Sequence, residues 1–248
     1  MKTPSPLRWA IIALAAALLA AVLAPPAPAQ TQRALRYEEL VWPWSCDPVT
    51  AKSNAQKRIA QLLFSGITKE VGKETYRADL YEATNDSPLP FATDEGYTIV
   101  IRLRPGVRWV KDPNPEASDE APEFQREINI ADIISTLRAV LNENTKNYAC
   151  PELAEYIKYA QGEVDYVQSG AELRLRLIRA AGASVARLMS FKVLPALVLD
   201  KSRNVIVPGS PAGQPETMLT SGPYWLDQRK SRERRLIFKA VREYHFGA

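Results

Sequence analysis

Apolar and polar residues alternate over several stretches of the chain, which is the pattern of a β-strand with one buried face. From Tyr97 to Arg104 every second residue is apolar, and Pro105 and Gly106 follow at once. A proline followed by a glycine favours a tight turn. The sequence therefore predicts a hairpin in which Val107 and Trp109 pair back on the first strand.

Two other stretches have the apolar spacing of an amphipathic helix. The first begins near Ser53 and stops before Gly66. The second is the clearer one, because Asn129 can cap it, Asp132 stands at the acidic position of a capping box, and the apolar residues over 130–141 form one stripe. Shorter helical segments are expected over 151–159 and 184–191.

Strands and helices are interspersed along the rest of the chain. Further strands are expected over 34–44, 164–167, 173–178 and 235–241. The stretch 111–127 is rich in Pro, Asp and Glu and has no period, so it is expected to be an exposed loop. The expected hairpin argues against a purely parallel sheet. We therefore expect an α/β fold in which a mixed sheet is flanked by helices.

The N-terminus has the features of a secretory signal peptide. Lys2 and Arg8 precede an apolar run of about 15 residues, and small residues follow up to Ala29. A membrane-spanning helix needs about 20 apolar residues, so a retained membrane anchor is the less favoured alternative. We expect cleavage after Ala29, which would remove residues 1–29 and release residues 30–248 into the periplasm.

The charge of the chain argues against nucleic-acid binding. The formal net charge is +4 at pH 7, and removal of Lys2 and Arg8 with the signal peptide would leave +2. A nucleic-acid-binding domain needs a concentrated basic face rather than a small net excess. A basic run does occur over 229–235. It is expected to be a solvated hairpin turn, and contact with an acidic partner or with lipid headgroups is the alternative.

The residues of common catalytic and metal sites are missing. His245 is the only histidine, so the usual zinc and iron sites lack their ligands. The sequence contains no Gly-x-Ser-x-Gly, Gly-x-Gly-x-x-Gly or Gly-Lys-Ser/Thr motif. A carboxylate pair drawn from Glu38, Glu39, Asp119 or Glu120 is the enzymatic alternative. We expect no enzymatic activity, no metal and no cofactor.

Aromatic and acidic residues gather near the end of the first expected strand. Tyr37 and Glu38 are followed closely by Trp42 and Trp44. Aromatic walls with a few carboxylates suit a solute that has an apolar body and a cationic end. These four residues are the candidate ligand site. The alternative is that the two tryptophans are only partly buried packing.

Cys46 and Cys150 are the two cysteines of the chain. In an oxidising compartment an even pair of cysteines can form a disulfide. The bridge would close a loop of about 100 residues and would stabilise the fold by about 4 kcal/mol in the chain-entropy description. Two separate buried thiols are the alternative.

Five segments, taken in their order, resemble the extracytoplasmic solute-binding proteins of the peptide/nickel type (family 5), which serve ABC importers. These segments are Asp47-Pro48, Ile59–Ile67, Tyr97–Trp109, Asn129–Ile133 and Thr220–Tyr224. The resemblance covers about residues 34–247. An acidic, Pro-rich insertion replaces the short turn that the family has after the position of Trp109.

The resemblance implies the fold of lobe I of a class II periplasmic binding protein. Members of the family are longer, and two lobes close around the solute. The resemblance places the first strand exit at that cleft. We therefore expect residues 30–248 to be a partial solute-binding domain that holds a solute, with a peptide expected, for an inner-membrane ABC permease. The alternative is an incomplete lobe that binds a partner protein instead of a solute.

Overall fold

The computed structural model describes residues 34–35, 47–49, 51–111, 123–142, 150–196, 219–227, 231, 235–241 and 244 of the chain. The chain divides into two units, Met1–Gln32 and Arg33–Ala248, and every described residue belongs to the second. The helical elements are α2 (Asn54–Leu63), η1 (Asp94–Gly96), α3 (Ile130–Leu141), α4 (Leu153–Tyr156), η2 (Gly182–Ser184) and α5 (Val185–Leu188). The strands are β1 (Ala34–Leu35), β2 (Thr68–Gly72), β3 (Thr75–Ala78), β4 (Phe91–Thr93), β5 (Thr98–Arg102), β6 (Arg108–Lys111), β7 (Glu123–Glu127), β8 (Tyr159–Ala160), β9 (Glu163–Val164), β10 (Tyr166–Ser169), β11 (Glu172–Arg176), β12 (Leu219–Thr220), β13 (Tyr224–Leu226) and β14 (Phe238–Ala240).

Helix α2 begins where the sequence predicts. The Ser53 hydroxyl accepts a hydrogen bond from the backbone N–H of Gln56, and the Gln56 side chain accepts one from the backbone N–H of Ser53. This reciprocal capping box satisfies donors that the first turn leaves without a partner. Ile59 and Leu63 face the core and are 2% and 0% exposed. Phe64 then turns to an extended conformation and ends the helix.

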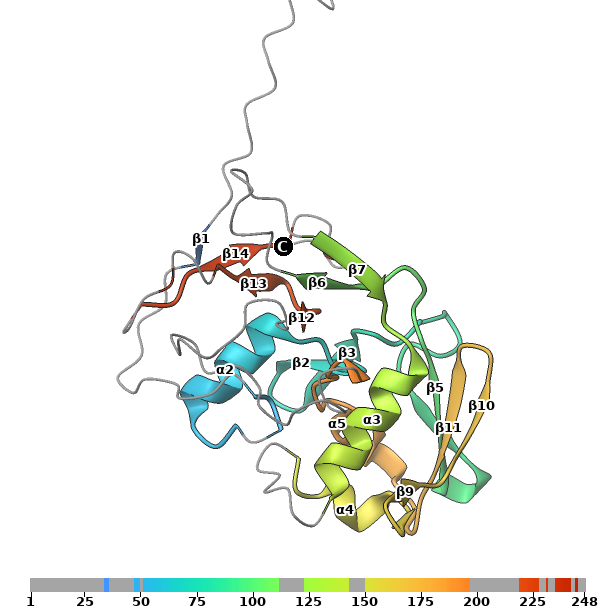
Figure 1. The fold of residues 1–248 in the computed structure, drawn as a ribbon. Helices are drawn as coiled ribbons and strands as arrows, with labels where there is room; N and C mark the ends of the chain where they lie inside the picture. Colours follow the sequence, from blue (N-terminus) through green and yellow to red (C-terminus); the bar gives the residue numbers. More distant parts are fainter. Residues whose placement is uncertain are drawn as a thin grey trace, which may run out of the picture. The chain divides into compact units, whose positions relative to one another are not determined.

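Helix α3 is also confirmed, with Asn129 and Asp132 forming the expected capping box. Its buried residues include Ile133 and Leu137, both 0% exposed, which belong to the predicted apolar stripe. The helix contacts α4 and β9 in the lower half of the view (Figure 1). The two shorter helical segments are present, although α4 and α5 are shorter than the sequence predicts.

Within the described residues, the strands form five small sheets rather than one continuous sheet. Their orders are β10-β11-β5-β4, β1-β14-β13, β12-β6-β7, β2-β3 and β8-β9. Each pairing between described strands is antiparallel. Helices lie among these sheets (Figure 1), so the predicted α/β class is confirmed.

The predicted hairpin over 97–109 is wrong in its pairing. The turn at Pro105 and Gly106 is present, but β5 pairs with β11 on one side and with β4 on the other. Strand β6 pairs with β7 and β12 in a different sheet. Because both edges of β5 are occupied, its hydrogen-bonding groups are not available to β6.

The predicted loop over 111–127 is shorter in the structure, because Glu123–Glu127 form β7 and pair with β6. Residues 112–122 of that loop lie outside the described residues. Strand β7 was not predicted because its sequence, Glu-Phe-Gln-Arg-Glu, is mostly polar.

The core lies on one face of the β10-β11-β5-β4 sheet. Leu173 and Leu175 of β11 are 0% exposed, and they pair in register with Ile101 and Ile99 of β5. The intervening residues of β11 face away from the core and are exposed. This period of two is the one that the sequence predicts for β11. Within the described residues, no helix is long and apolar enough to span a membrane.

Candidate functional site

The four predicted ligand residues, Tyr37, Glu38, Trp42 and Trp44, lie outside the described residues. The structure describes both ends of the segment that carries them. At the start, Leu35 of β1 pairs with Phe238 of β14. This pairing attaches the N-terminal side of the segment to the fold.

The far end of this segment is the predicted Asp47-Pro48 turn. The backbone N–H of Val49 donates a hydrogen bond of 2.8 Å to Oδ1 of Asp47, which is the pattern of an Asx turn. Pro48 and Val49 are buried, and Val49 is part of the main core. The chain is therefore attached to the fold on both sides of the candidate site.

A buried ion pair lies in the sheet that holds β1. Lys239 pairs in register with Ala34 on one side and with Trp225 on the other. Its Nζ lies 3.0 Å from Oδ2 of Asp227, and the two side chains are 8% and 0% exposed. The same nitrogen lies 5.0 Å from the centroid of the Trp225 ring, which is within the range of a cation–π interaction.

Sequence reasoning did not identify Trp225, Asp227 or Lys239. A signal was present, since Lys239 follows Ile237 and precedes Val241 on the same side of the predicted strand. A lysine in an otherwise apolar row must find an anionic partner when the row is buried. The partner could not be identified without the register of β13 and β14.

A second polar cluster lies at the C-terminal end of α2. Oδ1 and Oδ2 of Asp79 accept hydrogen bonds of 3.1 Å from the Tyr244 hydroxyl and from the backbone N–H of Gly66. The backbone N–H of Ser65 donates to Oγ of Ser221 at 2.9 Å, and Oγ of Ser65 donates to the Ser221 carbonyl at 2.9 Å. Burial and the adjacent Asp79 raise the pKa of Tyr244 above its ordinary value, so this hydroxyl stays a donor.

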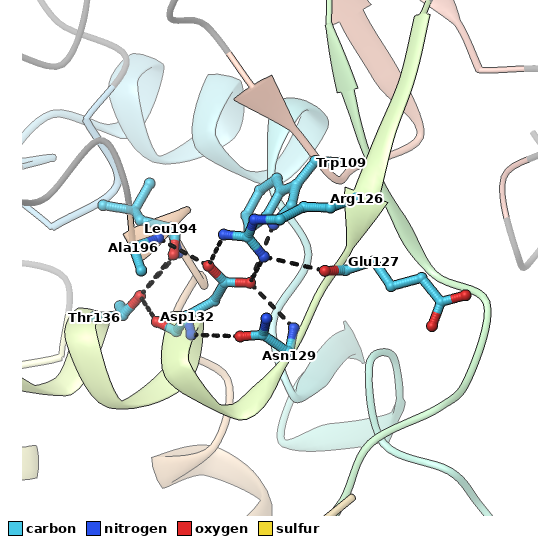
Figure 2. Close-up of polar contacts among 8 residues, drawn as sticks. All are labelled: Trp109, Arg126, Glu127, Asn129, Asp132, Thr136, Leu194 and Ala196. Atoms are coloured by element: carbon cyan, nitrogen blue, oxygen red, sulfur yellow. Dashed lines mark hydrogen bonds and ion pairs between the residues drawn. The ribbon is translucent and has the colours of Figure 1, made fainter.

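Asp132 is the centre of a third polar cluster, which Figure 2 shows. Its carboxylate accepts two hydrogen bonds from the Arg126 guanidinium, of 2.6 and 2.8 Å. It also accepts hydrogen bonds from Nε1 of Trp109 at 3.2 Å and from the backbone N–H groups of Ala196 and Asn129 at 2.8 and 3.1 Å. The cluster joins β6, β7 and α3 to the segment before residue 197.

Burial alone would raise the pKa of Asp132, but the hydrogen bonds from Arg126, Ala196, Asn129 and Trp109 together lower it below its ordinary value. The side chain is 0% exposed. Asp132 is therefore a charged group that the fold stabilises with donors from four residues. Each of the three clusters holds its carboxylate against a cation or a hydrogen-bond donor, which favours a positioning role over proton transfer.

The sequence led us to expect no metal site and no catalytic site. This expectation can be checked only against the described residues. Among those residues, no group of three His, Cys, Asp or Glu side chains is placed to hold a metal ion. His245, Glu38, Glu39, Asp119 and Glu120 lie outside them. The basic run over 229–235 falls between β13 and β14, and Arg235 at its end is exposed.

The predicted disulfide involves one described cysteine. Cys150 is half-buried and packs against the main core, while Cys46 lies outside the described residues. The bridge therefore stays a prediction. In the thiol form, burial and, to a lesser extent, the negative charge of Glu152 raise the pKa of Cys150 to about 11. Such a thiol would be a weak nucleophile at neutral pH.

Solved structures with a similar fold were found. One is a periplasmic oligopeptide-binding protein (OppAIV) from Borrelia burgdorferi, with a TM-score of 0.59 and 19% identity over 82% of this chain. A second is NikZ from Campylobacter jejuni in complex with Ni(L-His), with a TM-score of 0.56 and 16% identity over 84% of this chain. A third is the oligopeptide-binding protein AppA from Bacillus subtilis in complex with a nonapeptide, with a TM-score of 0.57 and 17% identity over 85% of this chain.

The similarity covers 38%, 35% and 36% of those three chains, so this chain spans little more than a third of their length. Two of the three are oligopeptide-binding proteins, and the third was solved with bound Ni(L-His). No protein-family model and no curated protein matches the sequence. The chain thus has the fold of part of the peptide/nickel-type solute-binding proteins, as the sequence resemblance implied.

Proposed function

We propose that this chain, which shares the fold of part of the peptide/nickel-type solute-binding proteins, binds a solute outside the cytoplasm for an ABC-type importer. The observation that carries the proposal is the fold similarity to such proteins over 82–85% of the chain. The expected signal peptide over 1–29 supports a periplasmic location. An inner-membrane permease is the corresponding partner.

The proposed solute is a peptide, or a similar molecule with a cationic end, that contacts Tyr37, Glu38, Trp42 and Trp44. Two of the similar structures are oligopeptide-binding proteins. The attachment of β1 to β14 and the Asp47 turn support this site, because they restrain the segment at both ends. The carboxylate would bind an amine and the aromatic rings would cover the apolar part of the solute.

The shared region is little more than a third of the similar chains. In the two-lobed mechanism, solute binding favours a closed state through the contacts that the second lobe adds. A loss of about 4 kcal/mol from missing contacts weakens binding about a thousandfold. We therefore expect this chain alone to bind peptides with a dissociation constant near the millimolar range.

Calorimetry tests the proposal with two probes, a pool of tripeptides with free N-termini and the same pool after N-acetylation. The expected result is weak binding of the free pool and at least tenfold weaker binding of the acetylated pool, because acetylation removes the positive charge. Trp42→Ala and Trp44→Ala should abolish this binding. Tyr97→Ala is the matched control, since Tyr97 is an aromatic residue 47% exposed outside the proposed site.

Micromolar binding by this chain alone would contradict the proposed partial site. Equal binding of both pools, or unchanged binding by the Trp42→Ala and Trp44→Ala variants, would show that the proposed residues do not form it. The location is tested separately by mass spectrometry of the periplasmic fraction, in which a mature N-terminus at Gln30 is expected. Recovery of an intact Met1 form in the membrane pellet would contradict it.

A second candidate function is the binding of a partner protein without a solute. The coverage of 35–38% of the similar chains favours this alternative, because much of a two-lobed site would have to come from elsewhere. The same calorimetry separates the two candidates. A folded protein that binds neither peptide pool at millimolar concentration would support the second candidate.

A further inference from the structure

Trp225 of β13 has a buried indole N–H that finds no acceptor among the residues that the structure describes. The residue is 1% exposed, and it belongs to a small apolar cluster with Val110, Val241 and Tyr244. A buried donor without an acceptor loses the hydrogen bond that it makes to water in the unfolded chain. Most buried side-chain donors in folded proteins are paired, so this indole stands out as a donor for a group from elsewhere.

A second buried donor, the Lys239 ammonium, lies on the neighbouring strand. Lys239 of β14 stands opposite Trp225 in the register of the sheet, and its Nζ lies 5.0 Å from the centroid of the Trp225 ring. Nζ is also 3.0 Å from Oδ2 of Asp227, but the two groups are not aligned for a hydrogen bond. Within the described part of the chain, the ammonium therefore has a counter-charge but no hydrogen-bond acceptor for its three donors.

The two donors project from the same face of the β1-β14-β13 sheet. Residues that stand directly opposite each other in an antiparallel pair have side chains on one face, and the contact with Nζ places the Asp227 carboxylate there as well. Leu226 and Phe238 project to the other face and belong to the main core. The face that carries Trp225 and Lys239 is thus separate from the main core.

The charge of this face determines which kind of acceptor fits it. Lys239 and Asp227 together carry no net charge, so an added anion would lie beside the Asp227 carboxylate and be repelled by it. A carbonyl oxygen is neutral and has two lone pairs, so one such oxygen can accept from the indole and from the ammonium. A hydrogen bond from a charged donor is also stronger than one between neutral groups. A carbonyl group therefore fits this face better than a carboxylate or a phosphate.

The two donors lie close to the start of the segment that carries the candidate ligand residues. The strands β1, β14 and β13 lie side by side (Figure 1), and Lys239 stands opposite Ala34 of β1. Tyr37 follows Ala34 by three residues. Because a chain extends by at most about 3.6 Å per residue, this separation is no more than about 11 Å, which is close to the length of an extended tripeptide.

We propose that Lys239 and Trp225 bind a main-chain carbonyl oxygen of the peptide solute. This inference rests on the proposed function, and it adds a subsite on β13 and β14 to the candidate residues of the segment after β1. The ammonium and the indole N–H both donate to the carbonyl oxygen, while Asp227 holds the ammonium in place. Since both side chains are buried in the free chain, the carbonyl enters by a local opening of this face, and the new hydrogen bonds offset the cost of that opening.

NMR of protein that is isotope-labelled on its tryptophans tests the subsite, because each indole N–H gives its own resonance. The resonance of Trp225 is assigned by its absence from Trp225→Phe. Trialanine and its C-terminal amide are the peptide probes, and acetate is the carboxylate probe. We expect both peptides to shift the Trp225 indole proton downfield, as a new hydrogen bond does, and acetate to leave it unchanged. Trp109 is the internal control, since its indole already donates to Asp132 at 3.2 Å.

Two variants test the contribution of each donor to trialanine binding. Trp225→Phe should weaken the affinity about threefold, and Lys239→Met with Asp227→Leu should weaken it about tenfold, because a charged donor contributes more. The double variant is used because Lys239→Met alone would leave the Asp227 carboxylate buried without its counter-charge. Lys158→Met is the matched control, since Lys158 pairs with Asp165 at 2.8 Å outside this sheet and should bind trialanine as the wild type does.

The outcomes separate this subsite from the proposed function. A Trp225 resonance that stays in place while those of Trp42 and Trp44 shift would refute the subsite and leave the proposed function standing. If neither peptide shifts any tryptophan resonance and calorimetry detects no binding, both are refuted. A shift with acetate as large as with trialanine, or a shift that is lost with the C-terminal amide, would contradict the carbonyl assignment. Wild-type affinity in both variants would contradict it equally.

Discussion

Lys239 and Asp227 form an ion pair of 3.0 Å inside the β13–β14 sheet, where their side chains are 8% and 0% exposed. Strand pairing brings the two residues together, since the backbone N–H of Asp227 donates to the Ile237 carbonyl at 2.8 Å. Taking two charges out of water is unfavourable. Each buried charge is therefore tolerated only because the opposite charge of its partner offsets this cost. The pair also lies beside Ala34 of β1, at the start of the segment that carries the proposed ligand residues.

Asp227→Ala should destabilise the protein by about 3–5 kcal/mol, because it leaves the Lys239 ammonium buried without its counter-charge. Urea unfolding measures the change. Glu155→Gln is the control, since Glu155 and Arg179 form an exposed pair with side chains 63% and 55% exposed. The control should change stability by about 1 kcal/mol or less. Equal effects of the two substitutions would contradict the buried character of the first pair.

Replacing both partners by apolar residues should recover much of that loss. The double variant Lys239→Met with Asp227→Leu removes both buried charges, and such replacements are often neutral or stabilising. The same urea unfolding compares it with Asp227→Ala. The double variant could instead have as low a free energy of unfolding as Asp227→Ala. The contact of Lys239 with Trp225, rather than its charge pairing with Asp227, would then be what stabilises this region.

Asp132→Asn should destabilise the fold and should also change its response to acid. The pKa of Asp132 is lowered in the folded protein, so the carboxylate stabilises the fold above its unfolded pKa of about 4. That contribution is lost as the pH falls through the folded pKa. The stability difference between wild type and Asp132→Asn should therefore be constant from about pH 8 to 5 and should shrink below about pH 4. A difference that does not depend on pH would contradict the assignment.

Gly222→Ala should destabilise the protein by about 1–3 kcal/mol or more, because the added methyl group has no space. A Cβ at this position would lie 2.4 Å from the Leu62 carbonyl oxygen and 2.8 Å from the Phe64 nitrogen. Gly72→Ala is the control, since the nearest atom to its added Cβ would be 3.8 Å away. Thermal unfolding compares the two variants, and a loss at position 222 no larger than at position 72 would contradict the close contact with α2.

The Cys46 to Cys150 disulfide should leave no reactive thiol in protein that is denatured without a reductant. Thiol labelling followed by mass spectrometry measures this directly. Reduction should lower the unfolding free energy by about 4 kcal/mol if the bridge forms. Two labelled thiols per chain would exclude the bridge, and so would a separation of the two Cα atoms greater than about 7 Å.

Local signals in the sequence were sufficient to predict the two longer helices, α2 and α3, and the strand β11. Asn129 and Asp132 mark the start of α3 because a capping box needs only residues three positions apart. Leu173 and Leu175 indicate β11 because its buried face repeats every second residue. In these cases the fold uses the conformation that neighbouring residues already favour.

Pairing between strands could not be predicted in the same way. A Pro105-Gly106 turn is compatible with a hairpin, yet β4 and β11 occupy both edges of β5. The Asp132 cluster shows the same limit, since the capping role of Asp132 was predictable and its contacts with Arg126 and Ala196 were not. These contacts depend on which distant segments lie next to each other. The four proposed ligand residues remain predictions from residue type and position.

The hydrogen bond from Tyr244 to Asp79 joins residues 165 positions apart, and it has a consequence for synthesis of the chain. At a translation rate of about 5–20 residues per second, Asp79 and its neighbours wait about 8–33 seconds for Tyr244 to be made. The Ser65 contacts with Ser221 span 156 positions and impose a similar delay. During that interval α2 can form, but the polar cluster at its C-terminal end stays incomplete and exposed to chaperones and proteases.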